Sequence, residues 1–98
     1  MDEEGTQDRI RQHADAIARG DLEAAVADFS EELRPHAPQI AEDLLPLPVT
    51  AAEVLSVDVG DSEAVAVIRY SGTGDATIRS RWQEEAGRAV IVNAEPVT

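Results

Sequence analysis

The chain has 98 residues and a formal net charge of -12 at pH 7, and all of its basic residues are arginine. Binding to phosphate groups needs a basic footprint, so this charge argues against proteins that bind nucleic acids or anionic membranes. The absence of cysteine excludes a disulfide framework and a thiolate metal site. No apolar run approaches the roughly 20 residues of a membrane span, and the start MDEEGTQD is acidic. We therefore expect one soluble, cytoplasmic domain over residues 1–98.

Three helices are predicted within residues 6–45. Thr6 is the expected N-cap of the first helix, which runs to about Arg19 and ends at Gly20. Asp21 is the expected N-cap of the second helix, which Pro35 stops. Pro38 suits the first turn of a third helix, which ends before the PLP segment at 46–48.

Each predicted helix has one apolar face. The apolar residues at helical spacing are Ile10, Ala14, Ile17 and Ala18 in the first helix, Leu22, Ala25, Val26, Phe29 and Leu33 in the second, and Ile40, Ala41, Leu44 and Leu45 in the third. The acidic residues Asp28, Glu31 and Glu32 of the second helix are expected to point outward.

Four strands are predicted within residues 50–95. Residues 50–59 alternate between apolar and polar side chains, and residues 63–95 hold three runs rich in Val, Ile, Thr, Tyr and Trp, separated by turns with Gly. We expect three-residue turns at 73–75 and 85–87, the second with Gly87 in the left-handed conformation. These turns would pair Tyr70 with Ile78, Ala66 and Val90 with Trp82, Ser80 with Val92, and Arg69 with Arg79.

Period-two alternation then divides the strands into two faces. The expected core face carries Ala66, Ile68, Tyr70, Ile78, Ser80, Trp82, Val90, Val92 and Ala94. The other face carries Val65, Val67, Arg69, Thr77, Arg79, Arg81, Ala89, Ile91 and Asn93. The order of three helices and then four strands predicts an α+β domain, with the three N-terminal helices packed on one face of a curved antiparallel four-stranded sheet.

Two segments of the sequence resemble a known family. GDLEAAVADFSEEL resembles the start of the nuclear transport factor 2-like superfamily, which includes the SnoaL-like polyketide cyclases, and TIRSRWQEEAGRAVIV is similar to the paired long strands of that superfamily. The resemblance implies a cystatin-like cone, in which the sheet wraps over the helices and leaves a pocket between them. It also implies a homodimer through the sheet.

The expected pocket contains few groups that could perform chemistry. We expect its lining to include Phe29, Tyr70, Ser80, Trp82 and Val92. Tyr70 is the best polar candidate, because a phenol can donate a hydrogen bond to a bound carbonyl or a developing oxyanion; the alternative is a core aromatic. His13 lies on the flank of the first helix and is a candidate general base, the alternative being a boundary histidine.

No complete catalytic set is recognisable. The inner face of the sheet has no carboxylate away from the turns, and Asp28 and Asp43 are expected to lie off the apolar stripes. His13 and His36 lack the HxH or HExxH spacing of a metal site, so neither a metal nor a cofactor is expected.

Arg69, Arg79 and Arg81 gather on one face of the predicted sheet. Like charges that face each other across strands destabilise a sheet unless acids or an anion lie between them. The arginines therefore indicate an anion site, or else ion pairs with Glu53, Glu63, Glu95 or a partner subunit.

Two functions remain open from the sequence. The favoured one is a non-catalytic dimeric module that binds a small ligand in the cone. The alternative is a small acid-base enzyme of the isomerase or polyketide-cyclase kind that uses Tyr70 with His13.

Overall fold

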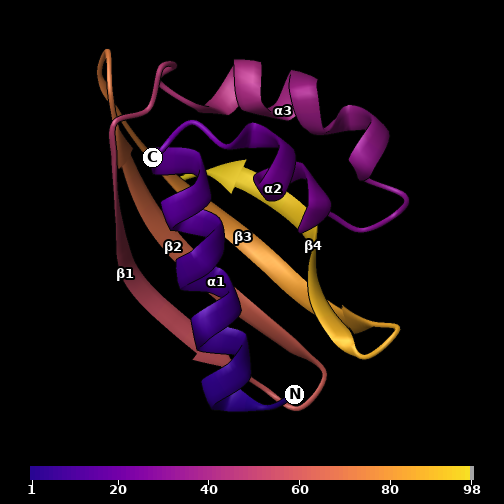
Figure 1. Ribbon diagram of the computed structural model, residues 1–98. Helices are drawn as coiled ribbons and strands as arrows, with labels where there is room; N and C mark the ends of the chain where they lie inside the picture. Colours follow the sequence, from indigo (N-terminus) through magenta and orange to yellow (C-terminus); the bar gives the residue numbers. More distant parts are fainter. Residues whose placement is uncertain (98) are drawn as a thin grey trace.

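The computed structural model describes residues 1–97, which form a sheet with helices packed on one of its faces (Figure 1). The helices are α1 (Glu3–Ala18), α2 (Leu22–Ala27), the short 3-10 helix η1 (Arg34–His36) and α3 (Ala37–Leu44). The strands are β1 (Ala51–Val59), β2 (Glu63–Ser71), β3 (Asp75–Glu85) and β4 (Arg88–Pro96). The predicted α+β class, the four-stranded antiparallel sheet and the position of the helices before it are confirmed. No helix within residues 1–97 is both long and apolar enough to cross a membrane.

The first helix begins four residues earlier than predicted. Asp2 caps it by accepting a hydrogen bond from the backbone N–H of Gly5 at 2.9 Å, and Thr6 lies inside the helix and is buried. Glu3 and Glu4 in the first turn favour this start, because acidic side chains interact well with the helix N-terminus. The other end agrees with the prediction: Gly20 has a positive φ of 80°.

The second helix is much shorter than predicted. Asp21 caps it as expected, by accepting from the backbone N–H of Ala24 at 3.2 Å, but the helix ends at Ala27. The backbone then bonds to β4: Ile91 N–H donates to the Asp28 carbonyl at 2.8 Å, and Ser30 N–H donates to the Ile91 carbonyl at 2.9 Å. These long-range bonds replace the helical ones, so the apolar spacing after Ala27 was misleading.

The strands lie in the order β1-β2-β3-β4, as predicted. The β2–β3 turn uses residues 72–74, so that Tyr70 pairs with Ala76 and Ala66 with Ser80. The predicted pairs of Tyr70 with Ile78 and of Ala66 with Trp82 are therefore wrong by two residues. Because side chains alternate with period two, this error leaves every residue of β2 and β3 on its predicted face.

The β3–β4 connection differs more from the prediction. It is a two-residue turn in which both Ala86 (φ 53°) and Gly87 (φ 82°) are left-handed, the geometry of a type I′ hairpin. Trp82 consequently pairs with Ile91, and Val90, although buried, pairs with Gln83. Val92 is the extra residue of a bulge in β4, between the pairs Arg81–Asn93 and Trp82–Ile91, so Ser80 pairs with Ala94 and the predicted pair of Ser80 with Val92 is wrong.

The core lies between the helices and the inner face of the sheet, which we define as the face that carries Trp82. Trp82 and Tyr70 both point inward, as predicted, and Trp82 is 0% exposed. Ala89 and Ile91, predicted for the opposite face, are buried on the inner side, whereas Val92 is only partly buried. In Figure 1, α1 crosses over β1 and β2, and α2 and α3 cover the other end of the sheet.

Candidate functional site

A cavity of about 330 Å³ lies between α2, α3 and the inner face of the sheet. This volume falls within the range of small-molecule sites. The ionisable and polar residues of its lining are His13, Glu23, Tyr70 and Ser80, and all its other lining residues are apolar. Many of the apolar ones are small, among them Ala25, Ala37, Ala41 and Ala94. Small side chains on facing elements leave the space that larger ones would fill.

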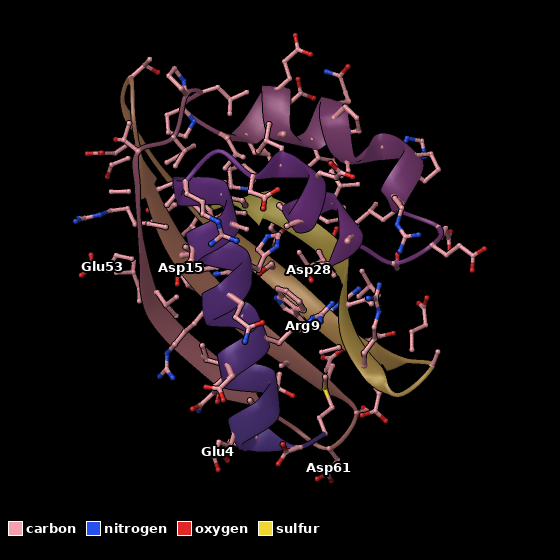
Figure 2. All side chains as sticks on the ribbon, viewed as in Figure 1. Glu4, Arg9, Asp15, Asp28, Glu53 and Asp61 are labelled. Atoms are coloured by element: carbon pink, nitrogen blue, oxygen red, sulfur yellow. The ribbon has the colours of Figure 1, made fainter. Side chains whose placement is uncertain are left out.

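His13 in the wall of the cavity belongs to a chain of three ionisable side chains, whose other two members lie behind the lining. His13 Nδ1 lies 3.0 Å from Asp28 Oδ2, and Arg9 Nη2 lies 2.7 Å from the other oxygen, Oδ1. Arg9 and His13 are four residues apart on α1 and therefore share one side of it. Figure 2 shows Arg9 and Asp28 close to each other beside α1, whereas Glu4, Asp15, Glu53 and Asp61 lie at the periphery.

These groups are largely removed from solvent. His13 is 4% exposed and Asp28 9%, while the Arg9 side chain keeps 29% of its surface. The His13 ring meets Trp82 edge-on with the ring centroids 5.4 Å apart, and its centroid lies 6.2 Å from that of Phe29. Packing on two aromatic rings together with the Asp28 contact fixes the orientation of the imidazole.

Ser80 connects the cavity to the central aromatic residue of the core. Trp82 Nε1 donates a hydrogen bond to Ser80 Oγ at 2.9 Å, so Trp82 lies behind Ser80 and does not itself line the cavity. A hydroxyl that accepts from an indole still has its own proton to donate. Ser80 therefore presents a hydrogen-bond donor to the cavity, and His13, which also lines it, contacts the same Trp82 ring.

Tyr70 supplies the other polar group on the sheet side of the cavity. Its side chain is buried, and this burial raises the pKa of the Tyr70 phenol well above its ordinary value because it disfavours the phenolate. The hydroxyl therefore stays protonated and able to donate. In the observed register Tyr70 pairs with Ala76, four positions from Ser80 and so about 13 Å away along the strand.

The structure brings most of the predicted pocket residues together. Phe29, Tyr70 and Ser80 line one cavity with His13. Trp82 is buried behind this lining, and Val92 lies at the bulge outside it, where Ile91 and Ala94 line the cavity instead. His36 is exposed near the start of α3.

Asp28 and Arg9 were missed by the sequence reasoning. Asp28 was expected to point outward from the second helix, but that helix ends before it and the residue is its C-cap. The carboxylate can therefore turn under α1 toward His13. The spacing of Arg9 and His13 on one helix side was the only local signal, and nothing local linked them to an acid in the next helix.

The three sheet arginines lie on the outer face, opposite the helices. Arg69 is 3.2 Å from Glu53, Arg79 is 3.2 Å from Glu95, and Arg81 is 3.9 Å from Glu63. The predicted opposition of Arg69 and Arg79 is wrong, since Arg69 pairs with Thr77 and Arg79 with Val67. Each arginine therefore has a carboxylate neighbour on an adjacent strand.

Comparison with known proteins identifies the fold but no family. No protein-family model and no curated protein matches this sequence. The chain is similar to the solution structure of RPA3114, a SEC-C motif containing protein from Rhodopseudomonas palustris, with a TM-score of 0.60 and 20% sequence identity. The match covers 91% of this chain and 76% of that chain. At this identity the likeness shows a shared fold alone.

The resemblance to the nuclear transport factor 2-like superfamily, with its SnoaL-like members and cystatin-like cone, is therefore wrong. A solved structure that the chain matches is a SEC-C motif protein with a different small α+β fold, and the helices here are short: α2 has 6 residues and α3 has 8. The two segments that resemble the superfamily share with it only a helix cap at Gly-Asp and the alternation of paired strands. Such features recur in many α+β domains, so they do not identify a family.

Proposed function

We propose that this protein binds a small, mostly apolar molecule in the cavity between α2, α3 and the sheet. The observation that carries the proposal is the lining itself: about 330 Å³ of space with apolar walls and a few convergent polar groups. Ligand sites commonly combine such walls with a small number of placed hydrogen-bonding groups. A cavity of about 150 Å³ holds benzene, so this one suits a molecule of about a dozen non-hydrogen atoms.

Titration with butylbenzene tests this proposal. Trp82 is the only tryptophan and contacts two lining residues, so its fluorescence should change as the cavity fills. Ligand that binds only the folded state also raises the melting temperature. Ala41→Phe, which places a ring into the cavity, should abolish both effects.

Gln39→Phe is the matched control, because Gln39 lies on the same helix but is exposed and does not line the cavity. This variant should bind as the wild type does. Absence of any saturable signal from the wild type with butylbenzene would refute the proposal.

A second candidate function is an acid-base enzyme, and the His13–Asp28 contact favours it. It supplies the carboxylate that the sequence analysis found missing, so the cavity that contains the protonated Tyr70 phenol also has a base oriented by an acid, which a proton-transfer enzyme needs. An apolar cyclic ketone in D₂O should then exchange its α-protons faster with the wild type than with His13→Gln. Equal exchange rates would argue against catalysis.

We also propose a homodimer through the outer face of the sheet, in a cytoplasmic protein. Val65 and Val67 on this face are only partly buried, and the arginine and glutamate pairs around them could re-pair with a second copy. Sedimentation at about 20 to 50 µM tests for this dimer, because subunit interfaces of ordinary size associate in that range. A single species of 10.5 kDa would refute the dimer.

A further inference from the structure

We infer that Asp28 holds His13 with its proton on Nδ1, so that Nε2 accepts a hydrogen bond from the hydroxyl group of the bound molecule. The ligand class is thus a small apolar molecule that carries one hydroxyl group. This inference rests on the proposed function, because it names the ligand of the same cavity.

The proton position follows from the two partners of Asp28. An ionised carboxylate only accepts hydrogen bonds. One of its oxygens is taken by Arg9 at 2.7 Å, and the other faces His13 Nδ1 at 3.0 Å. The hydrogen of the latter contact therefore sits on Nδ1, which leaves Nε2 of the neutral ring as an acceptor.

Nε2 is available to a ligand. Within residues 1–97 the hydrogen bonding of His13 uses Nδ1 alone, and His13 is one of the residues that line the cavity. An acceptor in an otherwise apolar wall favours a ligand that brings its own proton, because a polar group left unpaired on burial is costly.

Ser80 supplies the complementary group: like His13, it lines the cavity and contacts Trp82. Its Oγ accepts from Trp82, so its own proton is free to donate. A hydroxyl group both donates and accepts, and it can satisfy His13 Nε2 and the Ser80 hydroxyl together. A ketone or an ether has no proton for Nε2, a hydrocarbon offers neither function, and a carboxylate would meet the unprotonated face of the imidazole.

Three compounds of nearly equal size separate these cases: para-butylphenol, its methyl ether para-butylanisole, and para-butyltoluene. Trp82 fluorescence gives the dissociation constant of each. We expect the wild type to bind the phenol roughly five- to tenfold more tightly than the ether, the range of one net hydrogen bond, because only the phenol has a proton for Nε2. The toluene, which can neither donate nor accept, should bind least tightly.

Asp28→Asn tests the positioning role of the carboxylate. The amide of the variant can donate to Nδ1, which moves the imidazole proton to Nε2 and removes the acceptor. The preference for the phenol over the ether should fall to roughly twofold or less, because both compounds can then accept from Nε2–H, while toluene binding stays nearly unchanged. Asp43→Asn on α3, an exposed carboxylate outside the cavity lining, is the matched control and should keep the wild-type preference.

The tautomer can be read directly by ¹⁵N NMR of the two histidines at about pH 8.5, where imidazoles are mostly neutral; His36→Gln assigns the signals. We expect the proton of His13 on Nδ1 in the wild type and on Nε2 in Asp28→Asn. A proton on Nε2 in the wild type, or equal affinities for phenol and ether, would overturn this inference and leave the cavity proposal intact. Failure of all three compounds to bind would overturn both.

Discussion

Replacing Asp28 by alanine should destabilise the folded protein by about 2 to 3 kcal/mol. The change removes the carboxylate that pairs with Arg9 at 2.7 Å and with His13 at 3.0 Å. Hydrogen bonds to charged groups each contribute about 1.5 to 3 kcal/mol. The His13 side chain is only 5% exposed, so losing its contact should cost nearly the full free energy of such a bond. The Arg9 side chain is 29% exposed, so water can partly replace its lost partner.

Urea unfolding followed by Trp82 fluorescence measures this loss. For a domain of this size, a change of about 2 to 3 kcal/mol corresponds to a fall of roughly 10 to 20 °C in melting temperature. The slope of the free energy with urea should stay the same, since the surface exposed on unfolding hardly changes. Asp43→Ala, which loses only an exposed bond from Gln39, should match the wild type. A loss below about 0.5 kcal/mol for Asp28→Ala, the usual range for surface changes, would refute the reasoning.

Three further predictions concern the sheet. Trp82→Ala should cost about 3 to 5 kcal/mol because it empties the centre of the core, and a melting temperature within a degree or so of the wild type would contradict that. Ala86→Gly should raise the stability by about 0.5 to 1 kcal/mol, since Ala86 has a φ of 53° that glycine adopts without strain; an unchanged urea midpoint would argue against strain at this turn. Replacing Arg69 and Arg79 together by alanine should weaken self-association if the dimer uses the outer face, and sedimentation of an unchanged dimer would exclude that role.

The sequence predicted the elements better than their register. Caps and breakers are local, so Gly20 and Asp21 marked the end of the first helix and the start of the second correctly, and alternation located the strands, but periodicity made the second helix too long. Adding or removing one residue in a turn shifts the pairing of the two strands that the turn joins. The predicted β2–β3 pairs were wrong by two residues, which left Tyr70 and Trp82 on their predicted face. The predicted pairs next to the β3–β4 turn were wrong by one residue, which moved Ile91 to the inner side.

The sequence predicted several residues of the cavity lining, His13 and Phe29 on the helix side among them, but not the contact of His13 with Asp28. Tyr70 and Ser80 follow from strand alternation, which a single sequence displays. The His13–Asp28 contact joins α1 to the end of α2 across 15 residues, and it depends on where α2 stops. Because hydrogen bonds to β4 decide that end, no pattern within residues 21–35 could reveal it.

The β3–β4 turn and the bulge at Val92 decide which residues of β4 face the cavity. The two-residue turn sends Ile91 inward beside Trp82, and the bulge then also turns Ala94 inward beside Ser80, so that both residues line the cavity. The backbone of Ile91 is also hydrogen-bonded to the segment 28–30, and Phe29 forms a parallel bridge with Ile91. That bridge ends α2 at Ala27 and leaves Asp28 facing His13. The two-residue turn therefore determines the placement of the carboxylate that orients the imidazole, and the extra residue in β4 brings Ala94 into the apolar wall of the cavity.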